Sequence, residues 1–378
     1  MCIHSFPHTY RRKERFPMVK KLGWEILDGF TIEKVASGFS LPVNLAFVPD
    51  PRPQKTAPFF YVTELYGKIK AVTRDLKTYT FAEDLLNYEP DFIMPGTGES
   101  GVIGTAVHKS GDVFATMLYK EEGTFKNKVV RFRTKDGLRP EGVETIIDNI
   151  PSINAAHQVQ AVTIHNEILY VNVGDGMIDP NVAQDDEDLR GKILRLNLDG
   201  SIPSDNPTPG SYVYAKGLRN PFGAAWRESD QHLYISDNGP AVDDRIAKIL
   251  PGENYGWPQS IRSNSIFVWW YTQAPTALDF ARDQFGPEYK DHLFVGLFGH
   301  SYMEGKGEKG KKIVEMVIDK RDNVTGLNDF LRYVGAGPAS VCGLAFGPDG
   351  LYFTDLHGDK GFKKGERSGG NIWKVTKI

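Results

Sequence analysis

The segment GLAFGPDGLYFTD (residues 343–355) decides the fold, because its form recurs along the chain. It has two short apolar runs, the second of them aromatic, and a Gly-Pro-Asp-Gly turn sequence between them. Short runs of this kind, bounded by Gly, Pro and Asp, are typical of β-strands joined by tight turns. The segment therefore predicts a β-hairpin.

Five upstream segments share this form, and each carries an aromatic residue in its second run. Consecutive aromatics are about 53 to 64 residues apart, near the long end of the periods expected for propeller blades. Most units close with a third run of the type GKILRL (residues 191–196). Alternating strands with few candidate helices predict an all-β fold, a six-bladed β-propeller of four-stranded antiparallel blades. The matching aromatics are Tyr61, Phe114, Tyr170, Tyr234, Phe294 and Tyr352.

The repeats predict a single propeller domain over residues 25–378 and an N-terminal extension over residues 1–24. The first thirteen residues include basic side chains but no apolar region follows them, so they do not have the form of a secretion signal. A run around Thr80 to Asn87 is a candidate short helix. The segments 305–310 and 360–370, rich in Gly and Lys, are expected to be surface turns.

Composition excludes several classes of function. The chain has 378 residues with 45 basic and 48 acidic side chains and a net charge of −3, which gives no electrostatic case for binding nucleic acid or an anionic membrane. No apolar run of 18 residues predicts a membrane span. Cys2 and Cys342 cannot form a disulfide framework or a zinc site by themselves. The sequence gives no indication of the oligomeric state.

Polar side chains that could carry chemistry concentrate between residues 157 and 258, each after a short apolar strand. His157 precedes one strand, Asp175 ends the next, and Arg219 opens the following unit. In a propeller the loops of one face converge on the central channel, so these side chains can meet there. A histidine oriented by a carboxylate and faced by an arginine can take a proton from an alcohol. An aspartate at a strand end can equally cap a turn, so both interpretations stay open.

Taken together, the motifs of the chain resemble those of the soluble quinoprotein glucose/sorbosone (aldose sugar) dehydrogenases. The resemblance covers roughly residues 30–378 and implies a six-bladed propeller that oxidises a sugar with pyrroloquinoline quinone and calcium. It also implies an external electron acceptor and a periplasmic or secreted location. The motifs are GESGVIG (98–104), HQ (157–158), VGD (173–175), GKILR (191–195), DGSIP (199–203), GLRNP (217–221), DNGP (237–240) and NYGWP (254–258).

The resemblance implies roles for individual residues. His157 matches the general base, Asp175 the carboxylate that orients it, and Arg219 a catalytic cation that also contacts the quinone. Glu99 and Gln158 match positions that contact the substrate. The remaining matches are Asn220, Asn238, Asp244 and Thr272 on the cofactor side, His300 in place of a cofactor-binding lysine, and the carbonyls of Gly239 and Pro240 as calcium ligands.

The chain departs from the family pattern where positive charge is expected. The run GPASVC (337–342) stands where the family has arginines for the cofactor carboxylates, and Arg245 stands where it often has a carboxylate of a structural calcium site. Arg245 and the lysines at positions 306, 309, 311 and 312 are candidates for supplying that charge.

Two alternative functions stay open beside the sugar dehydrogenase. One is a calcium-dependent sugar-lactone hydrolase, with an axial calcium held by oxygens of Asp175, Asn220 and Asp244. The other is a propeller that has lost its cofactor and binds a carbohydrate or a protein partner.

Overall fold

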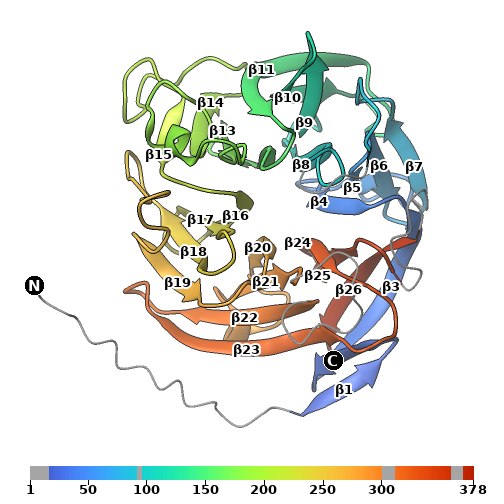
Figure 1. Cartoon of the computed structure of the whole chain (residues 1–378). Coiled ribbons are helices and arrows are strands. Elements are labelled where there is room, and N and C mark those ends of the chain that lie inside the picture. The colour runs from blue at the N-terminus through green and yellow to red at the C-terminus, as the bar shows by residue number, and fades with distance from the viewer. Residues whose placement is uncertain (1–16, 92–95, 300–310, 359–368) are drawn as a thin grey trace, which may run out of the picture.

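Six antiparallel sheets stand in a ring around a central channel (Figure 1). The computed structural model describes residues 17–91, 96–299, 311–358 and 369–378. In this part of the chain nearly all regular structure is strand, with two short 3-10 helices, Pro180–Gln184 and Pro287–Tyr289, and no α-helix. The prediction of an all-β, six-bladed propeller is confirmed.

In each blade, four strands follow one another along the chain from the channel outward. The last blade differs, because its outer strand comes from the N-terminal part of the chain. Blade 1 has β4 (Pro42–Phe47), β5 (Pro58–Glu64), β6 (Lys68–Thr73) and β7 (Thr78–Ala82). Blade 2 has β8 (Val102–Val107), β9 (Val113–Glu121), β10 (Thr124–Arg133) and β11 (Gly142–Ile153). Blade 3 has β12 (Val159–His165), β13 (Ile168–Val173), β14 (Lys192–Asn197) and β15 (Val213–Lys216).

The second half of the ring repeats this pattern. Blade 4 has β16 (Pro221–Arg227), β17 (His232–Asp237), β18 (Asp244–Ile249) and β19 (Ser265–Trp269). Blade 5 has β20 (Pro275–Phe280), β21 (Leu293–Leu297), β22 (Lys312–Ile318) and β23 (Val324–Tyr333). Blade 6 has β24 (Val341–Gly347), β25 (Gly350–Asp355), β26 (Gly370–Lys377) and, as its outer strand, the N-terminal β3 (Phe30–Phe39). Pairing of β26 with β3 closes the ring between the two ends of the chain.

The N-terminal segment is part of the propeller from residue 18 onward. The hairpin of β1 (Met18–Lys21) and β2 (Trp24–Leu27) pairs with β23 and widens the sheet of blade 5. Trp24 is fully buried there, so the structure attaches residues that the sequence analysis assigned to the extension. The candidate helix around Thr80 to Asn87 is wrong, because its first residues form the edge strand β7, whose Phe81 packs between blades 1 and 2.

The repeated aromatic residues explain why successive blades pack against each other in the same way. All six are buried in the second strand of their blades. Tyr170 contacts Trp226 of the next inner strand with ring centroids 4.8 Å apart, and Tyr234 contacts Phe280 at 5.0 Å, both edge to face. Such contacts contribute beyond their buried area. One aromatic residue per repeat therefore joins each of these blades to its successor.

Glycines on three inner strands allow neighbouring strands to approach near the channel. A Cβ on Gly104 of β8 would lie 2.2 Å from the Gln160 carbonyl oxygen, and one on Gly223 of β16 would lie 2.3 Å from that of Thr276. The same position in β24 is Gly343, which lies against the backbone of Asn44. Blades 2, 4 and 6 therefore need glycine where they contact the following blade.

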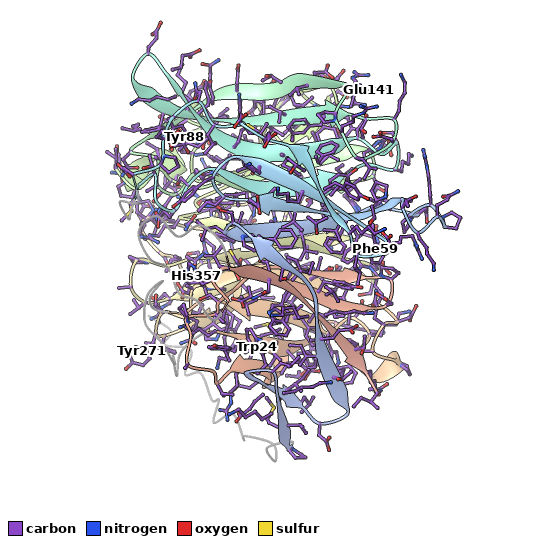
Figure 2. All side chains as sticks on the ribbon, turned by 90° about the vertical axis from the view of Figure 1, so that its right-hand side faces the viewer. Trp24, Phe59, Tyr88, Glu141, Tyr271 and His357 are labelled. Carbon is purple, nitrogen blue, oxygen red and sulfur yellow. The ribbon has the colours of Figure 1, made fainter. Side chains whose placement is uncertain are left out.

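The loops before the inner strands and after the second strands lie together on one face of the ring. Figure 2 shows this face through Tyr88, Tyr271 and His357, while Phe59 and Glu141 lie on the opposite side. No helix in the part of the chain that the structure describes has the length and apolar character needed to span a bilayer.

We expect Gly223→Ala to lower the free energy of unfolding by about 1 to 3 kcal/mol, because the added methyl group would overpack the contact between blades 4 and 5. Urea unfolding measures this difference. The matched control is Gly142→Ala, since Gly142 is an exposed strand residue with nothing within 4 Å of its added Cβ. Equal effects of the two substitutions would contradict the close approach.

Candidate active site

His157 and Asp175 form a hydrogen-bonded pair at one end of blade 3. His157 lies just before β12 and Asp175 just after β13, and because these strands are antiparallel neighbours, both residues reach the same end of the channel. The Nδ1 atom of His157 lies 2.6 Å from Oδ1 of Asp175, and both side chains are buried. The carboxylate favours the tautomer that carries hydrogen on Nδ1, so Nε2 of the neutral ring is an acceptor.

The backbone holds His157 in an unfavourable conformation. Its φ is +45°, in the left-handed region that costs about 1 kcal/mol for a residue other than glycine. Gly174 makes this placement possible, because a Cβ there would lie 2.4 Å from the His157 carbonyl oxygen. The sequence Val-Gly-Asp thus lets the histidine backbone rest against the end of β13, next to its carboxylate partner.

Three hydrogen bonds fix the carboxylate of Asp175. Its Oδ1 also accepts from the Met177 backbone N–H at 2.9 Å, and its Oδ2 accepts from the indole Nε1 of Trp257 at 2.9 Å. Burial alone would raise the pKa of Asp175, but its hydrogen bond to His157, the charge of His157, the Met177 N–H and the charge of Arg219 together lower it. The carboxylate is therefore ionised at neutral pH.

Arg219 and Glu99 complete the group of ionisable side chains at this end of the channel. Burial raises the pKa of Glu99, while the charges of His157 and Arg219 oppose the rise. Electrostatic interaction also links Arg219 with Asp175. Loops that precede the inner strands of blades 2, 3 and 4, together with the loop after the second strand of blade 3, thus bring together four side chains that lie up to 120 residues apart in the sequence.

The guanidinium of Arg219 faces carbonyl groups and an aromatic ring. Its Nη1 donates to the carbonyl oxygens of Asn238 at 3.0 Å and Gly239 at 2.8 Å, and its Cζ lies 5.6 Å from the ring centroid of Trp257. Among the described residues it has no carboxylate within ion-pair distance, and nothing accepts from its Nε or Nη2. A partly buried cation without an anionic partner is costly, so this charge favours an anionic ligand.

Two buried amide oxygens face the same region without a donor. Gln160 donates through Nε2 to Oδ1 of Asn220 at 3.2 Å, and Asn238 donates through Nδ2 to the Pro275 carbonyl at 3.1 Å. Nothing in the described part of the chain donates to the remaining oxygens, Oε1 of Gln160 and Oδ1 of Asn238. Buried polar atoms are normally hydrogen-bonded, so these oxygens are candidates for ligand contacts.

Two predicted contact residues have structural partners. Gln158 is fully buried, its Oε1 accepting from the Gly101 N–H at 2.7 Å and its Nε2 donating to the Gly101 carbonyl at 3.0 Å. Asp244 accepts from the N–H groups of Gly239, Gln273 and Ala274 at 2.6 to 2.9 Å. Both side chains are thus engaged by backbone groups and hold loops in place, and their direct contact with substrate or cofactor stays a prediction.

The other predicted positions are less informative. Thr272 is half-buried in the loop between β19 and β20, and His300 and the lysines at 306 and 309 lie outside the described residues. Lys312 forms an ion pair with Asp329. Lys311 is buried on the same face as His157. The pKa of His357 is lowered to about 4, mainly by burial and secondly by the charge of Lys311. Lys311 is thus a candidate cation on the side of blades 5 and 6.

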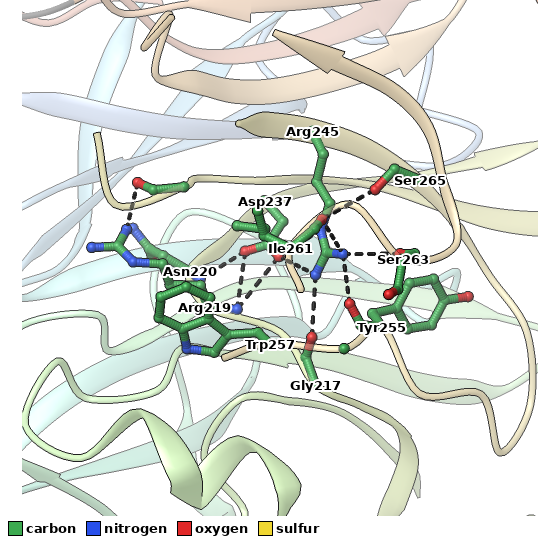
Figure 3. Close-up of polar contacts among 12 residues, drawn as sticks. Gly217, Arg219, Asn220, Asp237, Arg245, Tyr255, Trp257, Ile261, Ser263 and Ser265 are labelled. Atoms are coloured by element: carbon green, nitrogen blue, oxygen red, sulfur yellow. Dashed lines mark hydrogen bonds and ion pairs between the residues drawn. The ribbon is translucent and has the colours of Figure 1, made fainter. Parts of the chain in front are cut away.

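Arg245 does not supply charge to a ligand, because it is wholly buried in a network of its own (Figure 3). Its Nε and Nη2 donate to Oδ2 of Asp237 at 2.9 and 2.7 Å. The other oxygen of Asp237 accepts from the N–H groups of Arg219 and Asn220 at 3.2 and 2.7 Å. The guanidinium also donates to the carbonyls of Gly217, Tyr255, Ile261 and Ser263.

The implied calcium does not fit the arrangement of the predicted ligands as it stands. The carbonyl of Gly239 already accepts from Arg219, and a cation beside it would be repelled by the guanidinium. The described residues contain no cluster of three or more His, Cys, Asp or Glu side chains that could hold a metal. Asp175 and Asp244 are both occupied, so the axial calcium of the lactone-hydrolase alternative has no ligand set on Asp175, Asn220 and Asp244.

The implied quinone fits better. It carries three carboxylates, and the region offers the guanidinium of Arg219, which has no ion-pair partner among the described residues. The arginines expected near residues 337–342 are absent from the sequence, and Lys311 is a further buried cation on this face. The guanidinium of Arg219 therefore suits a negatively charged group at this end of the channel, while the two amide oxygens that lack a donor can accept a hydrogen bond from a ligand.

One site residue escaped the sequence analysis. Trp257 stands in the quoted motif NYGWP, but its contact with Asp175 spans 82 residues of sequence. Spacing within the motif gives no signal for such a contact, which depends on how the loop after β18 folds back over blade 3.

Comparison with known proteins agrees with the geometry. The profile of the family described as Glucose / Sorbosone dehydrogenase matches residues 39–355. The chain is 32% identical over 203 residues to quinoprotein glucose dehydrogenase B of Acinetobacter calcoaceticus, which is 45% of this chain but only 42% of that relative's length. A solved structure of a Thermus thermophilus protein, provisionally described as a glucose dehydrogenase, has a TM-score of 0.72 at 27% identity, over 92% of this chain and 99% of that one.

A third comparison concerns ligand binding in a relative. The PQQ-bound aldose sugar dehydrogenase of Streptomyces coelicolor has a TM-score of 0.67 at 22% identity, and the match covers 92% of this chain and 98% of that one. At this identity the likeness shows the fold alone.

We expect Arg245→Met to lower the free energy of unfolding by about 3 to 5 kcal/mol, because it leaves Asp237 as an uncompensated buried charge and removes the donor of four carbonyls. Chemical denaturation measures the loss. Arg262→Met is the matched control, since Arg262 pairs with Asp243 at the surface and such a pair contributes about 0 to 1 kcal/mol. A loss for Arg245→Met no larger than that of the control would contradict the assigned role.

Proposed function

The chain belongs to the glucose/sorbosone dehydrogenase family, and from this premise we propose that it is a quinoprotein dehydrogenase that oxidises a sugar, with an aldose as substrate. The observation that carries the proposal is the pair of His157 and Asp175, 2.6 Å apart, beside the guanidinium of Arg219. A base oriented by a carboxylate and accompanied by a fixed cation can remove a hydroxyl proton and stabilise the charge that develops.

His157 acts as the general base in this proposal. Its Nδ1–H is held by Asp175, so its Nε2, which has no partner among the described residues, receives the proton of the substrate hydroxyl. The imidazolium that forms is stabilised by the ionised Asp175, whose low pKa keeps the proton on the ring. Glu99 faces the same ring and accepts a hydrogen bond from a second hydroxyl of the sugar.

The cofactor side is formed by Arg219, Asn220 and Asn238. Pyrroloquinoline quinone, when bound, would supply the acceptor for the hydride that leaves the sugar carbon. Arg219 provides a positive charge for its carboxylates through Nε and Nη2. Oδ1 of Asn238 accepts a hydrogen bond or coordinates a cation. The charge of Arg219 interacts with Asp175 and Glu99, which supports a cofactor side adjacent to the proposed base.

Calcium belongs to the proposal only together with an anion. The carbonyls of Gly239 and Pro240 are its proposed ligands, and Pro240 is exposed while Gly239 is engaged by Arg219. An anionic ligand that draws the guanidinium away from Gly239 would free this oxygen and offset the repulsion between the two cations. An external electron acceptor would be needed to reoxidise the cofactor.

Reconstitution with calcium and pyrroloquinoline quinone tests the function directly. We expect a change in the absorption spectrum of the cofactor, and dye reduction with at least one member of a panel of aldoses. We expect His157→Gln to lower kcat by about 10² to 10⁴-fold, the range for loss of a general base, without loss of cofactor binding. His232→Gln is the control. His232 begins β17 at a turn of blade 4, at the end of that strand opposite to the face that carries His157 and Asp175.

Two outcomes would reject the proposal. One is the absence of any spectral change at tens of micromolar cofactor. The other is calcium-dependent hydrolysis of a sugar lactone without dye reduction, which would support the hydrolase alternative.

Calcium binding should depend on the quinone. Calorimetric titration of calcium alone is expected to give no heat of specific binding, because Arg219 occupies the Gly239 carbonyl. In the presence of pyrroloquinoline quinone we expect calcium at 100 times its Kd to stabilise the protein by about 2.7 kcal/mol, seen as a rise in Tm. Tight calcium binding without the quinone would show that the two carbonyls are open to a metal by themselves.

A further inference from the structure

Trp257 contacts two of the three side chains assigned to proton removal. Its indole Nε1 donates to Oδ2 of Asp175 at 2.9 Å, and its ring lies 5.6 Å from the guanidinium of Arg219. Figure 3 shows the indole beside Arg219, on the loop that follows β18. No other described tryptophan donates to an ionised residue of this site.

The backbone of Trp257 is fixed by a loop of blade 3 and by the segment that links blades 3 and 4. Its N–H donates to the Gly217 carbonyl at 3.0 Å, and its carbonyl accepts from Nε2 of Gln184 at 2.5 Å. The rest of the loop is held by Arg245, which donates to Tyr255 and Ile261. Because the loop is anchored at these points, the indole N–H is held in a constant position relative to blade 3.

The contact with Asp175 has a chemical consequence for His157. An indole N–H is a donor only, so it stabilises the ionised carboxylate and withdraws part of its charge from the imidazole. Without this donor, Asp175 would attract the protonated ring more strongly, while Met177 and His157 would still hold Oδ1. The imidazolium would then be held more strongly by its carboxylate partner.

We propose that Trp257 is a positioning residue that acts on His157 through Asp175: its N–H fixes the plane of the carboxylate and limits the negative charge that the carboxylate presents to the imidazole. In the described part of the chain, the charged side chains that interact with His157 or with its partner Asp175 are Asp175, Glu99 and Arg219. Trp257 carries no charge, so replacing it adds or removes no charged group. The effect on turnover rests on the proposed function, whereas the effect on the ring of His157 does not.

Trp257→Phe tests the inference, because it keeps an aromatic ring beside Arg219 and removes only the N–H. Trp226→Phe is the matched control: Trp226 is also a blade 4 tryptophan that donates to a blade 3 side chain, Thr163 at 3.1 Å, but in the other half of the channel. The first measurement is an NMR titration of the histidine ring signals in protein without cofactor. The signals of His157 are assigned by their loss in His157→Gln.

We expect the titration midpoint of the His157 ring to move up by about 0.5 to 1 pH unit in Trp257→Phe, the equivalent of one hydrogen bond, and not to move in Trp226→Phe. With the reconstituted enzyme, the acidic limb of the kcat/KM profile should move up by the same amount. KM should be unchanged, and kcat lost at pH 7 should return at higher pH. A purely structural defect would not be restored by raising the pH.

The outcomes separate the two proposals. A shifted midpoint in a protein that oxidises no sugar supports the role of Trp257 and rejects the proposed function. An unchanged midpoint together with an unchanged pH profile overturns the role of Trp257, whatever the activity. If Trp257→Phe does not fold, the test uses the NMR signals of the indole N–H groups in the wild-type protein. The signal of Trp257 should change with pH together with the ring signals of His157, and the signal of Trp226 should not. An indole signal of Trp257 that is insensitive to this titration overturns the inference.

Discussion

The buried ion pair between Arg245 and Asp237 is the constraint on which the rest of the site depends. A buried pair adds little net stability unless its remaining donors and acceptors are satisfied. Here the guanidinium also donates to four carbonyls, which lie in two separate loops. One loop carries Arg219 and the other carries Trp257, so a single fully buried side chain sets the distance between them.

From this pair a series of hydrogen bonds leads to His157. Asp237 accepts from the backbone of Arg219, Trp257 donates to Asp175, and Asp175 accepts from His157. A histidine of blade 3 is thereby oriented by residues of blade 4. Its left-handed backbone, which would relax in a looser setting, persists because several partners determine it at once. Rigidity at the end of the blades is therefore a property of the site as well as of the fold.

The sequence predicts the blades well because each blade repeats the same packing, so one aromatic residue and one turn per unit carry a local signal. It also indicates that His157, Asp175, Arg219 and Asp244 could meet, since equivalent strand ends lie on one face, whereas Glu99 is indicated only by the family resemblance. It cannot tell whether a polar side chain there accepts a backbone N–H or faces the channel. This is why Gln158 and Asp244 are found engaged by backbone groups, and why Arg245 is found inside blade 4.

The distribution of charge favours an anionic cofactor over an axial metal. Arg219 directs its guanidinium at the carbonyls that a metal would use and has no carboxylate partner within the described residues. A divalent cation placed there alone would meet a fixed positive charge in a medium of low dielectric constant. An anion there would be attracted, because it supplies the negatively charged partner that the guanidinium lacks. The proposed order of binding, with the anion before calcium, thus follows from where this one cation lies.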